Sequence, residues 1–173
     1  MKRGGPILVV EDNLKDQAMI KTAFENIGVE DTVYTVNDGS DAIAFFKRER
    51  EYADCNKFPF PTFLMTNLDL PRVNGLELLL FLKRSHLTII PAIIFTSSAE
   101  QDDINNAYLL GANAYHVKSP GLGGLCAQLR DIYQFWISVE LPKADEYGRL
   151  LPTEGKGGLG QKIGHPMITR EKG

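Results

Sequence analysis

Residues 6–12 of the chain read PILVVED, and this short stretch decides the fold class. Ile7 to Val10 form an uninterrupted apolar run, which is the pattern of a strand buried on both faces. Strands of this kind belong to parallel sheets that helices cover on both sides. Nucleotide-binding proteins built on such sheets carry a glycine-rich loop after the first strand, whereas this chain carries two acids, Glu11 and Asp12. The stretch therefore predicts an α/β protein without a phosphate-binding loop.

The rest of the chain repeats this alternation. Four more β-branched or apolar runs predict strands, and a segment with helical spacing of apolar residues follows each of them. Five strands that alternate with five helices predict a doubly wound, five-stranded parallel sheet with helices on both faces. The expected features are further strands at 32–36, 62–67, 91–98 and 114–118, helix stops at Gly28 and Gly111, a helix cap at Ser40 or Asp41, an irregular loop at 51–61, and a last amphipathic helix from Leu122 to Val139.

Composition limits the class of function. The net charge of −3 argues against a nucleic-acid partner, because nucleic-acid binders usually present a basic face. No apolar run approaches the roughly 20 residues of a membrane span, and the run at 7–10 is too short for a signal peptide. We therefore expect a cytoplasmic protein. Its 173 residues suffice for one domain, expected over 1–140, and a glycine-rich tail at 141–173 with the composition of a linker.

Polar residues stand where the predicted strands end. Besides the two acids after the first strand, Asn67 follows the third, Thr96 ends the fourth and Lys118 ends the fifth. In doubly wound sheets these strand ends meet at one edge, where ligands bind. Adjacent carboxylates there favour a hard cation such as Mg²⁺, and a hydroxyl and a lysine suit an anionic oxygen. Each residue alone is more often structural, but the full set points to one site.

Five motifs carry a resemblance to a known family: ILVVEDN, NDGSDAI, NLDLPRVNG, IIFTSS and AYHVKSP. In this order and spacing, over about residues 6–140, they resemble the CheY-like receiver domains of two-component response regulators. The resemblance implies a flavodoxin-like fold with strand order 2-1-3-4-5 and a signalling protein rather than an enzyme. The loop at 51–61 and the ending FWISVELP further resemble single-domain receivers that partner phytochrome-type histidine kinases.

The resemblance also implies roles for the strand-end residues. In the family an aspartate after the third strand accepts a phosphoryl group from a histidine kinase, and that position falls on Asn67. The residue two positions later lends its main-chain carbonyl to Mg²⁺. The implied roles are Mg²⁺ binding by Glu11, Asp12 and the main-chain carbonyl of Asp69, phosphoryl contacts from Thr96 and Lys118, and an inward swing of the aromatic ring of Tyr115 on activation.

The amide at Asn67 changes the expected chemistry. A carboxylate is a competent nucleophile, but an amide oxygen carries no full charge and should not form an acyl phosphate. Asp69 is a poor substitute, since two residues along a strand displace it by about 6.5 Å, and attack needs atoms about 3 to 3.5 Å apart. We therefore expect a pseudo-receiver with at most weak Mg²⁺ binding. The alternatives are a conventional acceptor at Asp69 and an Asn67 that replaces an aspartate by engineering.

Function should then pass through protein contacts. The expected partner is a histidine kinase or another signalling protein, without nucleic acid or membrane. The last helix is a common dimer surface in the subfamily that the chain resembles, so a homodimer through that helix is a further candidate. We expect Phe135 and Trp136 on this helix to lie in the core, and Lys118, facing a neutral amide, to pair with Asp12.

Overall fold

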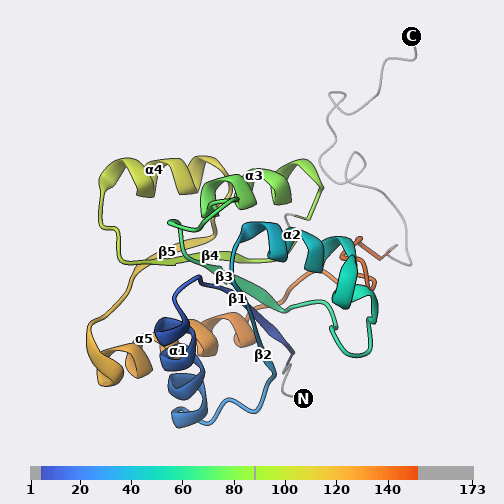
Figure 1. Cartoon of the computed structure of the whole chain (residues 1–173). Coiled ribbons are helices and arrows are strands. Elements are labelled where there is room, and N and C mark those ends of the chain that lie inside the picture. The colour runs from blue at the N-terminus through green and yellow to red at the C-terminus, as the bar shows by residue number, and fades with distance from the viewer. Residues whose placement is uncertain (1–4, 88, 152–173) are drawn as a thin grey trace, which may run out of the picture.

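The computed structural model describes residues 5–87 and 89–151, which form a five-stranded parallel sheet between two layers of helices (Figure 1). The strand order β2-β1-β3-β4-β5 is the predicted one. The strands are β1 (Ile7–Val10), β2 (Val33–Val36), β3 (Phe63–Thr66), β4 (Ala92–Thr96) and β5 (Ala114–Val117). The helices are α1 (Leu14–Asn26), α2 (Gly39–Lys47), the 3₁₀ helix η1 (Arg50–Ala53), α3 (Gly75–Arg84), α4 (Gln101–Leu109) and α5 (Gly121–Ser138).

Each face of the sheet has its own apolar core. Helices α1 and α5 cover one face around Phe24, Phe63 and Phe95, and α2, α3 and α4 cover the other around Phe45 and Leu78 (Figure 1). All residues of β1, β3 and β4 are buried, as their continuous apolar runs predict. The three central strands therefore hold their carboxyl ends in fixed register.

Three expectations about local structure were wrong. The cap of α2 is Asp38, whose carboxylate accepts hydrogen bonds from the main-chain nitrogens of Ser40 and Asp41, the two residues predicted to cap. The loop at 51–61 is not wholly irregular, because η1 begins it. On α5, the side chain of Phe135 is 56% exposed, and only Trp136 packs partly against the core.

Part of the predicted tail folds onto the domain. Residues 143–151 form a hairpin in which Ala144 pairs with Leu150. Gly148, at φ +76°, turns this hairpin and lies so close to Phe60 that a Cβ atom would collide with that ring. Arg48, after α2, donates hydrogen bonds to the main-chain oxygen of Glu146 at 3.2 and 2.5 Å. The remainder of the predicted tail, 152–173, lies outside the described residues.

Candidate functional site

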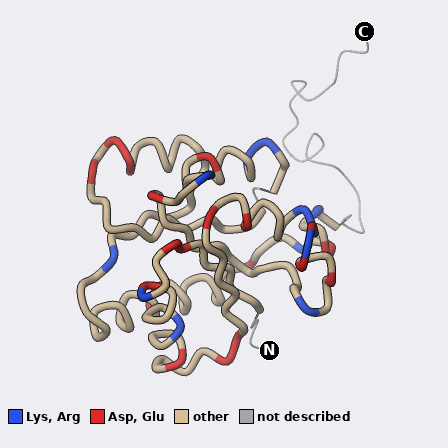
Figure 2. The backbone as a smooth tube through the Cα atoms, viewed as in Figure 1, with Lys and Arg blue, Asp and Glu red and all other residues tan. Residues whose placement is uncertain are grey.

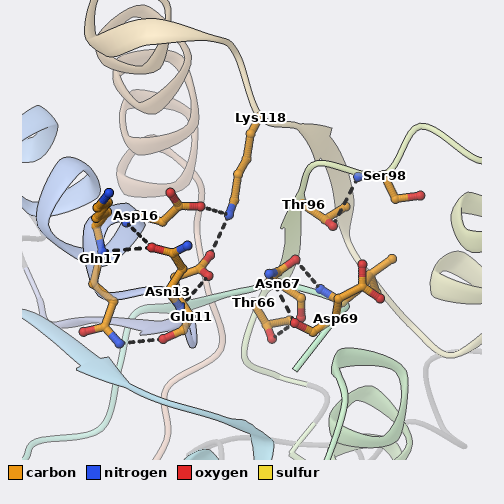
Figure 3. Close-up of polar contacts among 12 residues, drawn as sticks. Glu11, Asn13, Asp16, Gln17, Thr66, Asn67, Asp69, Thr96, Ser98 and Lys118 are labelled. Carbon is orange, nitrogen blue, oxygen red and sulfur yellow. Dashed lines mark hydrogen bonds and ion pairs between the residues drawn. The ribbon is translucent and has the colours of Figure 1, made fainter. Parts of the chain in front are cut away.

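Main-chain hydrogen bonds fix the strand ends that carry the predicted site. The nitrogen of Asn67 donates to the oxygen of Val10 at 3.0 Å, which ties the end of β3 to the end of β1. The nitrogen of Lys118 donates to the oxygen of Thr96 at 2.8 Å, which ties the end of β5 to β4. Glu11, Asn67, Thr96 and Lys118 consequently gather at one edge of the sheet, as the sequence predicted (Figure 3).

Lys118 forms the central ionic contact of this edge. Its Nζ lies 2.6 Å from Oε2 of Glu11 and 2.8 Å from Oδ2 of Asp16, on the first turn of α1. Burial lowers the pKa of Lys118, but the hydrogen bonds to the two carboxylates outweigh burial and leave the pKa raised. The predicted pairing with Asp12 is wrong: Asp12 is exposed, and its side chain makes no hydrogen bond or ion pair within the described part of the chain.

Glu11 is a buried carboxylate with both oxygens engaged. Its side chain is 2% exposed, and burial raises its pKa despite the contact with Lys118. Oε1 accepts the main-chain nitrogen of Asn13 at 3.1 Å. Asn13 in turn caps α1, because its Oδ1 accepts the main-chain nitrogen of Asp16 at 3.2 Å. This chain of contacts places the Asp16 carboxylate next to Lys118.

The side chain of Asn67 folds back onto its own loop (Figure 3). Its Oδ1 accepts the main-chain nitrogen of Leu68 at 2.8 Å, and its Nδ2 donates to the main-chain oxygen of Asp69 at 3.4 Å. Gly75 makes this loop compact, since a Cβ atom there would lie 2.3 Å from the main-chain oxygen of Asn67. The amide therefore bonds to its neighbours within the loop.

The geometry around Asp69 differs from the one expected. We placed Asp69 on a continuing strand, on the same side as Asn67, but β3 ends at Thr66 and the chain bends at Leu68 and Asp69. The carboxylate of Asp69 is exposed, and its main-chain oxygen receives the Asn67 amide. The displacement along a strand therefore does not describe where Asp69 lies.

Thr96 and Tyr115 meet at the loop after β4. The hydroxyl of Thr96 is buried and accepts the main-chain nitrogen of Ser98 at 3.4 Å, so it does not cap α4. The Tyr115 hydroxyl donates to the main-chain oxygen of Ser98 at 3.1 Å, and its ring packs against the core. Burial raises the pKa of Tyr115. The tyrosine ring is thus turned inward in this structure.

A second ionic contact, which the sequence analysis missed, braces the loop of Asn67 from the other side. Asp38, 1% exposed, pairs with Arg72, which has a positive φ of 62°. Burial tends to raise the pKa of Asp38, but hydrogen bonds from Ser40 and Arg72 outweigh it and lower the pKa. The main-chain nitrogen of Gly39 also donates to the oxygen of Val73 at 3.0 Å. These contacts fasten the loop to the start of α2.

As arranged here, the site does not fit a divalent cation. Both oxygens of Glu11, the oxygen of the Asn67 amide and the main-chain oxygen of Asp69 already accept hydrogen bonds, and the carboxylates of Asp12 and Asp69 are exposed. No group of three His, Cys, Asp or Glu residues suited to a metal ion occurs among residues 5–87 and 89–151. Mg²⁺ prefers six oxygen ligands in octahedral geometry, and here a lysine ammonium supplies the positive charge.

Known proteins similar to this chain share its fold and its sequence pattern. The family described as response regulator receiver domain matches residues 7–130. The response regulator Rcp1 of Synechocystis sp. is 31% identical over 140 residues, which cover 80% of this chain and 93% of the relative. The solved structure of the phosphorylated cyanobacterial phytochrome response regulator RcpA is 35% identical, with a TM-score of 0.74 and coverage of 81% of this chain and 99% of that one. The Mn²⁺-bound form of Rcp1 is 31% identical, with a TM-score of 0.70 and coverage of 80% and 99%.

Proposed function

This chain belongs to the response regulator receiver domain family, and from that membership we propose that it is a pseudo-receiver, which signals through protein contacts without accepting a phosphoryl group. Receivers are signalling proteins of two-component systems rather than classical enzymes. The observation that carries the proposal is Asn67 at the acceptor position, with its amide bonded within its own loop.

The chemistry of phosphoryl transfer supports this proposal. An attacking oxygen must carry electron density that it can share with phosphorus, and the amide oxygen of Asn67 is neutral and already accepts the nitrogen of Leu68. The ammonium of Lys118, which would neutralise an incoming phosphoryl group, is held by Glu11 and Asp16. The side chain at the acceptor position and the ammonium that would neutralise the phosphoryl group are therefore both already bonded to other groups.

The conventional alternative is that Asp69 accepts the phosphoryl group, or that Asn67 is an engineered replacement of an acceptor aspartate. Asp69 has one favourable property, an exposed carboxylate without a hydrogen bond or ion pair to another described side chain. Neither the Thr96 hydroxyl nor the Lys118 ammonium is bonded to that carboxylate. We therefore prefer the pseudo-receiver.

Labelling with acetyl phosphate and Mg²⁺, followed by intact mass measurement, tests the proposal. We expect no adduct on the parent chain and an adduct of one phosphoryl group on Asn67→Asp. The matched control is Asp69→Asn, which should behave like the parent. An adduct on the parent that Asp69→Asn abolishes would overturn the proposal and identify Asp69 as the acceptor.

Metal binding follows the same reasoning. Related receivers bind divalent cations, as the Mn²⁺-bound form of Rcp1 illustrates. We propose that Glu11, Asp12 and the main-chain oxygen of Asp69 bind Mg²⁺ at most weakly in the parent, because the first and last of these groups already accept hydrogen bonds.

The partner is expected to be a protein. Two solved relatives are named as phytochrome or bacteriophytochrome response regulators, so we propose a histidine kinase or another signalling protein as partner and the cytoplasm as location. No helix of the described residues is both long and apolar enough to cross a membrane.

Acidic and basic residues are interspersed over the elements in Figure 2, and such a mixed surface does not favour nucleic acid as a partner. The exposed ring of Phe135 makes the face of α5 our candidate for a homodimer.

The folded unit is proposed to extend past the boundary near residue 140. The hairpin at 143–151 is bonded to Arg48 and packs Gly148 against Phe60. We therefore propose that the receiver unit ends at Leu151 or later.

A further inference from the structure

Lys118 is bound by a carboxylate that does not come from a strand end. Asp16 lies on the first turn of α1, and Figure 3 shows the Lys118 ammonium turned toward Asp16 and Glu11, with Asn67 and Thr96 on its other side. Lys118 and Asn67 share no hydrogen bond in the described structure. The hydrogen bonds of the ammonium are therefore made to Glu11 and Asp16 and not to the acceptor position.

The donors of Lys118 explain why a second carboxylate is present. An ammonium has three donors, and its side chain here is only 13% exposed, so water satisfies it incompletely. Glu11 fills one donor. Asn67 fills none of the others, because its neutral amide oxygen accepts the nitrogen of Leu68 and makes no hydrogen bond with Lys118. Asp16 supplies the missing acceptor at 2.8 Å.

The start of α1 holds Asp16 ready for this contact. The main-chain nitrogen of Asp16 is bonded to the capping side chain of Asn13, which fixes where the helix begins. The partial positive charge at a helix N-terminus also favours a carboxylate in the first turn. The Asp16 side chain remains 37% exposed, so it keeps part of its hydration while it contacts Lys118.

We propose that Asp16 replaces the missing acceptor carboxylate as the second counter-charge of Lys118, and so holds the lysine in one position whether or not a phosphate donor is present. Asp16 is then a positioning residue. In the trio of Glu11, Lys118 and Asp16, the two carboxylates neutralise the lysine ammonium without any charge at position 67. This inference rests on the proposed function, because it assigns a role to Asp16 only if residue 67 offers no negative charge.

A thermodynamic cycle between positions 16 and 67 tests the inference. Asp16→Asn should lower the melting temperature of the parent by about 2–4 °C, the shift that loss of one partly exposed ionic contact gives in a domain of this size. In the Asn67→Asp background the same substitution should cost less than about 1 °C, because Asp at 67 then offers Lys118 a carboxylate. Asp16→Glu, which keeps a carboxylate at this position, should keep the melting temperature of the parent.

The matched control is Asp102→Asn, which removes an exposed first-turn carboxylate of α4 that makes no ion pair with another described residue. It reports how much of the effect comes from the helix terminus alone. An equal loss at Asp16 in both backgrounds would show a merely structural role and overturn the inference. A loss no larger than that of Asp102→Asn in the parent would overturn it as well.

A second measurement needs no substitution at position 16. A cross-hydrogen-bond NMR correlation from Nζ of Lys118 to the side-chain carboxyl carbon of Asp16 should be present in the parent and weaker in Asn67→Asp. Its absence from the parent would refute the assignment directly. The labelling experiment on the parent decides the proposed function separately, since it detects a phosphoryl adduct, whereas the correlation reports the partner of Lys118 in the unlabelled chain.

Discussion

Removal of Lys118 should destabilise the fold because it leaves a buried charge without compensation. In Lys118→Met, Glu11 would stay 2% exposed next to Asp16 without the ammonium that separates them. Breaking a buried pair in this way costs about 3–5 kcal/mol. Protonation of Glu11 limits the cost, because burial raises the pKa of this carboxyl and the variant lacks the ammonium that lowers it. We expect a loss of about 3 kcal/mol in the free energy of unfolding.

The loss should depend on pH in a defined direction. Because the pKa of Glu11 would be higher in the folded than in the unfolded variant, the variant gains relative stability as pH falls toward 4.5 and is weakest above the folded pKa. Urea denaturation at pH 7 and pH 5 measures this, with Lys21→Met, at an exposed position on the same helix as Asp16, as the control. A loss below about 1 kcal/mol at pH 7, or a loss that is the same at both pH values, would refute this account of the ion pair.

Three further perturbations follow from the structure. Asp38→Asn should cost stability near neutral pH and little in acid, because the lowered folded pKa of Asp38 stabilises the parent above its ordinary value of 3.8 and this stabilisation is lost as pH falls through the folded pKa; urea denaturation followed by circular dichroism at several pH values should show the difference between parent and variant shrinking toward acid pH. Gly75→Ala should destabilise by about 3 kcal/mol or more in urea denaturation because the added methyl group meets main-chain atoms, whereas Gly123→Ala on α5, with open space around it, should stabilise by about 0.5–1 kcal/mol. Arg48→Ala should cost about 1–2 kcal/mol and speed amide hydrogen exchange in the hairpin at 143–151, while unchanged exchange there would show that Arg48 does not anchor it.

The sheet and the positions of the site could be predicted because local patterns decide them. Continuous apolar runs predict buried parallel strands, and the carboxyl ends of such strands must share one edge. Glu11, Asn67, Thr96 and Lys118 therefore lie together as expected. Each of these residues follows or ends a strand, so its position depends little on how side chains pack.

The partners of Lys118 could not be predicted in the same way. Asp12 and Asp16 both lie near the start of α1, and the choice between them depends on the residue at which the helix begins. Asn13 was the available signal, since an asparagine cap there starts the helix at Leu14 and places Asp16 in its first turn.

The contacts of the hairpin were beyond prediction for a different reason. Its apolar residues are few and irregularly spaced, so its sequence resembles a linker. It is held largely by main-chain acceptors, such as the oxygen of Glu146 that binds Arg48, and main-chain groups leave no mark on the side-chain pattern. The ion pair of Arg72 with Asp38 could not be predicted either, because it depends on a left-handed backbone conformation at Arg72 that is uncommon for a residue other than glycine.

The trio of Glu11, Lys118 and Asp16 also affects how long a signal could last after its stimulus ends. A conventional receiver stays activated after a stimulus for the lifetime of its acyl phosphate, because hydrolysis removes the phosphoryl group. Ionic contacts between side chains contain no bond to hydrolyse, and they re-form as quickly as side chains rotate. A receiver in which these contacts persist would keep no covalent record of past stimuli, and its signal would depend on its own abundance and on that of the proteins it contacts.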